Sequence, residues 1–161
     1  MRRIGWSLLL SGIMFFGVFP LAAAKDGDAP KPAPSGKTLV QSELTFILAA
    51  KEPAKMDSRL EHMAKDLRRA FAGRYRRFDF HKAWKPALKK GETKEFQLPG
   101  KGSLKITFRG SDGPYLRLHL NMPDWDGVVR VRDGRRFFHA GRKHGDSTLI
   151  IGIKLSSESG S

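Results

Sequence analysis

The feature that most constrains this fold is one amphipathic helix followed by a long run of short alternating segments. Apolar residues recur at steps of three and four in residues 56–71, which makes one apolar stripe along a helix. The stripe consists of Met56, Leu60, Met63, Ala64, Leu67 and Phe71. After Gly73 the apolar period changes to two, which is typical of half-buried strands. Because one helix cannot cover both faces of so many strands, we predict an α+β domain with one amphipathic helix packed on a curved, mainly antiparallel sheet of about six to eight strands.

Both ends of the predicted helix carry signals in the sequence. Ser58 with Glu61 matches a capping box, and Asp57 is a rival N-cap. Gly73 suits the left-handed position just past the end of a helix. These signals predict a helix over residues 57–72.

Strands are predicted on both sides of this helix. A strand over residues 39–50 precedes it, with alternate apolar residues on one face. In the strand that follows it, Phe78, Phe80 and Trp84 share one face. An Asp-Gly pair at 133–134 predicts a tight two-residue hairpin turn. The strands predicted after the helix span residues 76–84, 95–98, 104–108, 115–122, 128–132, 135–140 and 148–155.

The N-terminus has the pattern of a secretory signal peptide. Two arginines precede an uncharged, largely apolar stretch over residues 4–21, and three alanines then supply small residues for cleavage after Ala24. An uncleaved membrane anchor is the alternative, although several Gly and Ser residues weaken this stretch as a span. With cleavage we expect no transmembrane span and a periplasmic or secreted bacterial protein. The expected organisation is a signal peptide over 1–24, a proline-rich tether over 25–36, one α+β domain over 37–155 and a polar tail over 156–161.

Composition narrows the chemistry and the partners. The chain contains no cysteine, which excludes disulfides, thiolate metal sites and cysteine nucleophiles. Its 30 Lys and Arg residues face 16 Asp and Glu residues, and removal of the two signal-peptide arginines leaves 28 against 16, a net charge of +12. For an exported protein this charge predicts a polyanionic partner, namely an acidic envelope polymer, an anionic lipid or an acidic protein, rather than cytoplasmic nucleic acid.

Basic residues alternate with the inward apolar positions of the predicted strands. In a simple meander Lys105, Arg117 and Arg130 would be cross-strand neighbours. Like charges directly opposite each other are destabilising, so such a sheet either splays them into solvent or binds an anion. We take anion binding as the hypothesis and a solvated basic face as the alternative. The candidate polyanion-binding residues are Lys105, Arg109, Arg117, His119, Arg130, Arg132, Arg135 and Arg142.

A second basic segment, residues 130–143, contains two adjacent aromatic residues. Phe137 and Phe138 break simple alternation. One of them is therefore either exposed beside arginines, where it can stack on bases or sugars, or packed over a sheet edge.

No catalytic constellation stands out. Residues 35–38 resemble the end of a phosphate-binding P-loop, but the glycine that this motif requires five positions before Gly36 is absent. Residues 145–147 (Gly-Asp-Ser) resemble the nucleophile block of a hydrolase family, but no histidine follows them. His139, His144 and Asp146 match no standard metal spacing, and two basic residues lie between the histidines. We therefore expect no enzyme, no metal and no cofactor, but an exported basic binding or accessory domain. The alternative is a structural subunit of an envelope or secretion assembly that docks by a sheet edge.

Four segments carry a resemblance to known proteins. They are "MDSRLEHMAKDLRRAF", "YRRFDF", "FQLPGKGSLKITF" and the glycine-containing ending "HAGRKHGDSTLIIGI". Together they make residues 44–155 similar to small exported proteins of unknown function from delta-proteobacteria and related bacteria. The resemblance implies an exported single α+β domain and assigns no catalytic residue.

Overall fold

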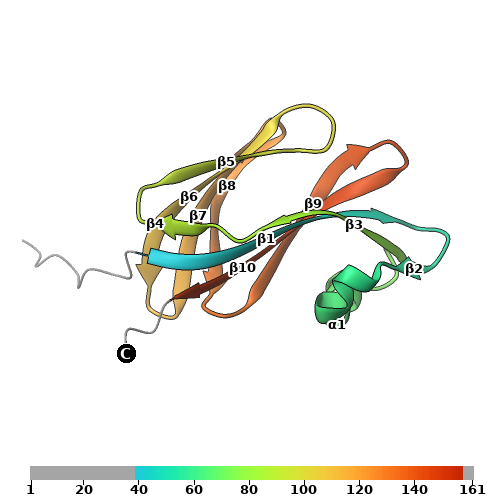
Figure 1. The fold of residues 1–161 in the computed structure, drawn as a ribbon, viewed down its shortest axis with the longest axis horizontal. Helices are drawn as coiled ribbons and strands as arrows, with labels where there is room; N and C mark the ends of the chain where they lie inside the picture. The colour runs from blue at the N-terminus through green and yellow to red at the C-terminus, as the bar shows by residue number, and fades with distance from the viewer. Residues whose placement is uncertain (1–38, 158–161) are drawn as a thin grey trace, which may run out of the picture. The chain divides into compact units, whose positions relative to one another are not determined.

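The computed structural model describes residues 39–157, which form ten strands, one 3-10 helix and one short α-helix (Figure 1). The predicted signal peptide and tether lie outside these residues. So does the end of the predicted polar tail, whose first two residues belong to the last strand. No helix within residues 39–157 is long and apolar enough to cross a membrane.

Six strands form the first sheet, in the order β2-β3-β1-β10-β9, with β4 paired to the start of β1 (Figure 1). Every neighbouring pair is antiparallel except β2 with β3. The first and last strands of the described chain, β1 and β10, therefore lie side by side at the centre. The strands are β1 (Leu39–Ala50), β2 (Lys55–Met56), β3 (Arg77–Trp84), β4 (Ala87–Lys89), β9 (Arg136–His144) and β10 (Ser147–Ser157).

Four strands form the second sheet, an antiparallel meander in the order β5-β6-β7-β8. Consecutive strands pair with each other, so each connection is a hairpin. The strands are β5 (Thr93–Gln97), β6 (Ser103–Asp112), β7 (Tyr115–Met122) and β8 (Trp125–Arg132).

The larger hydrophobic core lies between the two sheets. Leu104, Leu118 and Leu120 of the second sheet are fully buried in one cluster with Leu44 and Ile153 of the first. The predicted inward alternation of these strands is confirmed, and so is the α+β class. The strands form two sheets that do not close into a barrel, instead of the single curved sheet expected. The short helix cannot cover the apolar face of a four-stranded meander, so that face packs against the first sheet instead.

The helical segment covers part of the outer face of the first sheet. It begins as a 3-10 helix, η1 (Ser58–Met63), continues as α1 (Ala64–Ala70), and is shorter than predicted. Its apolar stripe is confirmed, because Leu60 and Leu67 are fully buried in a second cluster that contains Ile150 of β10. The central strands β1 and β10 are therefore covered on both faces where the helix lies.

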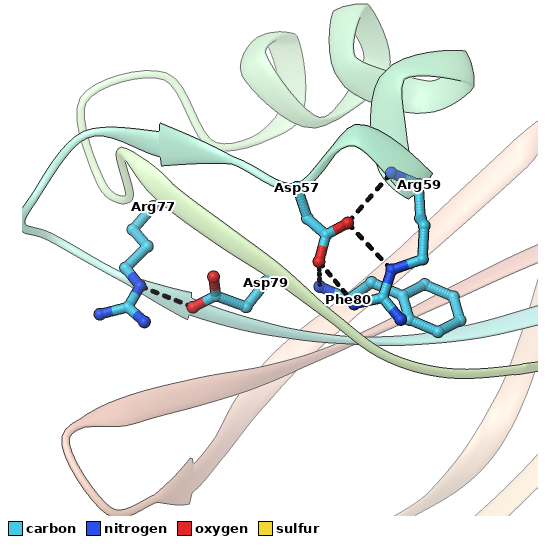
Figure 2. Close-up of polar contacts among 5 residues, drawn as sticks. All are labelled: Asp57, Arg59, Arg77, Asp79 and Phe80. Carbon is cyan, nitrogen blue, oxygen red and sulfur yellow. Dashed lines mark hydrogen bonds and ion pairs between the residues drawn. The ribbon is translucent and has the colours of Figure 1, made fainter.

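Asp57, rather than the capping box, starts this helix and ties it to β3 (Figure 2). One carboxylate oxygen of Asp57 accepts from the backbone N–H and the Nε of Arg59, both at 3.0 Å. The other accepts from Nη2 of Arg59 at 2.7 Å and from the backbone N–H of Phe80 at 3.3 Å. The Arg59 guanidinium lies 4.3 Å from the centre of the Phe80 ring. These bonds, those from Arg59 first, hold the pKa of the Asp57 carboxyl well below its ordinary value of 3.8. Nearby on β3, Arg77 donates to Asp79 at 2.6 Å.

A register shift between β1 and β3 redistributes the aromatic residues of β3. The shift lies between Phe46 and Ile47. Phe78 and Phe80 pack on the helix side of the sheet, whereas Trp84 contacts Phe46, with ring centres 4.9 Å apart, in the core between the sheets. The prediction that these three aromatic residues of β3 share one face is therefore wrong, because a bulge reverses the alternation.

Candidate functional site

The outer face of the second sheet presents four exposed arginines on three neighbouring strands. Alternate residues of β6, β7 and β8 point into the core between the sheets, so the residues between them face away from it. We call this set the basic face. It comprises Arg109 of β6, Arg117 of β7, and Arg130 and Arg132 of β8.

Three of these arginines share one row across the sheet. Arg117 pairs directly with Arg130 in the β7–β8 register. On the other side of β7, the β6 register shifts between Phe108 and Ser111, so that Arg109 and Gly110 lie opposite Arg117. Gly110 has a φ of +94°, a conformation that glycine adopts without strain and that this bulge requires. The bulge therefore extends the row of positive charge to a third strand.

Arg130 is the one member of the basic face with a carboxylate partner within residues 39–157. Its Nη2 lies 3.0 Å from Oδ2 of Asp112, and its guanidinium lies 4.8 Å from the centre of the Tyr115 ring. In the register, Tyr115 stands between Asp112 and Arg132. Arg130 therefore leans along the sheet toward Asp112, which reduces its repulsion with Arg117.

The other three arginines of the basic face make no side-chain hydrogen bond or ion pair with any residue between 39 and 157. Two large hydrophobic residues are also exposed on this outer face, Tyr115 at 37% and Val128 at 59%. Both stand at outward positions of the strand alternation, but neither they nor Asp112 were among the predicted candidate residues. The alternation that revealed Arg117 was the signal for Tyr115 as well.

Lys105 and His119 belong to a different part of the same sheet. Lys105 pairs with Glu95 and Asn121, so the prediction that it neighbours the two arginines is wrong. His119 Nε2 lies 3.1 Å from a carboxylate oxygen of Asp126. Asn121 also donates to Asp126, and these bonds, that from Asn121 first, hold the pKa of the Asp126 carboxyl below its ordinary value. This end of the outer face therefore carries its own carboxylates.

Two further candidates lie away from the basic face. Arg135 is exposed in the turn after β8 and faces a groove beside α1. Arg142, on β9, donates to the backbone oxygen of Lys101 at 2.5 Å and to Asp124 at 3.4 Å. A register shift opposite Gly141 redirects Arg142 toward the second sheet. Its side chain is only 22% exposed, and it links β9 to two loops of the second sheet.

The two adjacent phenylalanines of β9 are both half-buried. Phe137 packs against the core between the sheets, and Phe138 packs against the cluster under the helix. Neither is the exposed stacking residue considered above. β9 therefore carries an aromatic residue on each face at this point, which explains the broken alternation.

The histidines offer no metal site within residues 39–157, where no three side chains of metal-ligating type gather. The His139 ring lies 4.9 Å from the Trp125 ring, centre to centre. Burial lowers the pKa of His139, and the nearby Asp124 opposes that shift. His139 therefore packs as a neutral aromatic side chain near neutral pH.

No known family model, no curated protein and no solved structure matches this chain.

Proposed function

We propose that this protein is an exported, non-enzymatic binding domain that holds an acidic polymer of the bacterial envelope on its basic face. The observation that carries the proposal is the row of Arg109, Arg117 and Arg130 across three strands, with Arg132 beside it and one carboxylate, Asp112, among them. The net charge of the chain supports the same conclusion.

The row has an energetic cost that a bound anion removes. Like charges directly opposite each other destabilise a sheet. An arginine presents a planar fork of donors that matches phosphate and carboxylate groups. Arginines on adjacent strands also stand about 5 Å apart at their Cβ atoms, so they can meet successive charged groups of an extended polymer.

Binding to labelled polyphosphate tests the proposal by fluorescence anisotropy. We expect the affinity of the purified protein to fall steeply between about 50 mM and about 200 mM NaCl, because binding releases counterions. Arg117→Glu should weaken binding about five- to tenfold at the lower salt concentration, the equivalent of about 1 kcal/mol. Lys51→Glu is the matched control: Lys51 is exposed in the loop after β1, so the same change in net charge should leave the affinity within about twofold.

Equal losses in the two variants would show that only net charge matters and would contradict the proposal. Binding that does not respond to salt would also contradict it. An envelope protein that stays bound at high salt and ignores both substitutions would favour the alternative, a structural subunit docked through an end strand such as β9 of the first sheet.

A further inference from the structure

A second basic site lies on the outer face of the first sheet, beside α1. An open groove of about 490 Å³ runs between α1 and the β8–β9 turn. This volume falls within the usual range for small-molecule sites. The groove is lined by Asp66, Arg69, Ala70, Gly134, Arg135, Arg136, Phe138 and Lys154.

A guanidinium held in place forms one wall of the groove. The Arg136 side chain is only 9% exposed. Its Nη2 lies 3.2 Å from Glu43 and its Nη1 lies 3.5 Å from Asp66. Glu43 is also 3.2 Å from His62. Because a guanidinium carries five N–H donors, these two contacts leave donors for a ligand while they fix the orientation of the group.

Three more cations surround Arg136. Lys154 is its direct neighbour in the β9–β10 register, Arg69 lies in the last turn of α1, and Arg135 precedes it in the turn. None of these three forms an ion pair with a residue between 39 and 157. Among residues 39–157, four cations and a single carboxylate, Asp66, thus line the groove, which makes it an electropositive concavity.

The groove also has an apolar wall. The Phe138 ring packs closely over Gly152, where an added Cβ would lie 3.2 Å from the ring, and its edge meets Phe71 at 5.8 Å between ring centres. Ala70 of α1 lines the groove as well. A fixed guanidinium beside an aromatic ring suits a ligand that carries both an anionic and an apolar part.

We propose that this groove binds a small organic anion, with its phosphate or carboxylate group on Arg136, Lys154 and Arg135 and its apolar part against Phe138. Its lining residues differ from those of the basic face, and the turn from Arg132 to Arg135 connects the two sites. The groove would give the protein a discrete ligand in addition to a polymer.

Amide chemical shifts measured by NMR test the site, with phenyl phosphate and phenylacetate as probes for the two kinds of anion. We expect saturable shifts at residues 134–138 and 152–154 with at least one probe below about 10 mM, and about fivefold weaker binding of inorganic phosphate, which lacks the apolar part. Arg135→Gln combined with Lys154→Gln should weaken binding about tenfold or more. Both side chains are at the surface, so this variant keeps the buried Arg136 contacts intact.

Arg117→Glu is the matched control and should leave probe binding unchanged, which separates this site from the basic face. Three results would overturn the proposal. They are the absence of a saturable shift with either probe, probe binding that is weakened by Arg117→Glu but not by the double substitution at 135 and 154, and equal affinity for inorganic phosphate and phenyl phosphate.

Discussion

Reversal of the charge at Arg117 should stabilise the protein while it weakens polymer binding. Arg117 pairs directly with Arg130, so Arg117→Glu replaces a repulsive cross-strand pair by an attractive one. At about 5–7 Å in the dielectric of water, two unit charges interact with about 0.6–0.8 kcal/mol. A change of sign is then worth about 1.2–1.6 kcal/mol. Arg130 already forms an ion pair with Asp112, and the Asp112 carboxylate would repel the new carboxylate at position 117. We therefore expect a net gain of about 0.5–1 kcal/mol, within the range for cross-strand pairs.

Lys105→Glu is a control with the same change in net charge and the opposite expected sign. Lys105 pairs with Glu95 across β5 and β6, so the reversal places two carboxylates opposite each other. We expect a loss of about 0.5 kcal/mol. The general benefit of a lower net charge is the same in the two variants, so their difference reports the charges that surround each position.

Urea unfolding followed by tryptophan fluorescence measures both free energies of unfolding. The difference between the variants should be largest at about 10 mM salt and should nearly vanish at about 1 M, where the Debye length falls to about 3 Å. If both variants shift stability in the same direction at low salt, or if Arg117→Glu destabilises the protein, the pairing of charges derived for the outer face is wrong.

Two further predictions concern the helix that covers the first sheet. Leu67→Ala removes a fully buried side chain from the cluster under the helix, so urea unfolding should show a loss of about 3 kcal/mol in the free energy of unfolding. Lys65→Ala, at an exposed position of the same helix, is the control and should change this free energy by less than about 0.5 kcal/mol. A loss below about 1 kcal/mol for Leu67→Ala would refute the packing of α1. Asp57→Asn should destabilise the protein at neutral pH, because the pKa of Asp57 is depressed in the folded state. A carboxyl group whose pKa is depressed by folding stabilises the protein when the pH is above its pKa in the unfolded chain. This stabilisation is lost as the pH falls toward its pKa in the folded protein. The difference between wild type and Asp57→Asn in unfolding experiments should therefore stay constant above about pH 5 and shrink below pH 3.8, and a pH-independent difference would contradict the charge-assisted bonds.

Local patterns predicted much of this fold because they depend on neighbouring residues alone. The three- and four-residue spacing of Leu60 and Leu67 identified the buried side of the helix, and the period of two identified the buried side of β6, β7 and β10. The opposition of Arg117 and Arg130 followed from the short connection between two consecutive strands.

The division into two sheets was not predictable by the same reasoning. It depends on the pairing of β1 with β10, from the two ends of the described chain, and on the burial of the meander against them. A strand with one apolar face shows the same alternation whether that face packs against a second sheet or under a helix, so alternation alone cannot distinguish the two arrangements.

Bulges limited the prediction of the site. One extra residue reverses the alternation. No residue pattern marked the bulge of β3, and the signal of Gly141 within β9 was not used. The bulge near Gly141 turned Arg142 into a structural residue, and the bulge at Gly110 brought Arg109 into the row of arginines. The groove beside α1 was not predicted because its residues come from segments that are distant in the sequence, such as Arg69 of α1 and Lys154 of β10.

The most direct test of the central claim is where an acidic polymer touches the protein. Amide and arginine side-chain shifts measured by NMR during titration with polyphosphate give that location. We predict the largest changes at Arg109, Arg117, Arg130 and Arg132, with changes at the outer face of the first sheet that are small by comparison. Changes centred on β1 and β10, or spread evenly over all exposed Lys and Arg residues, would contradict the assignment of the basic face as the binding surface.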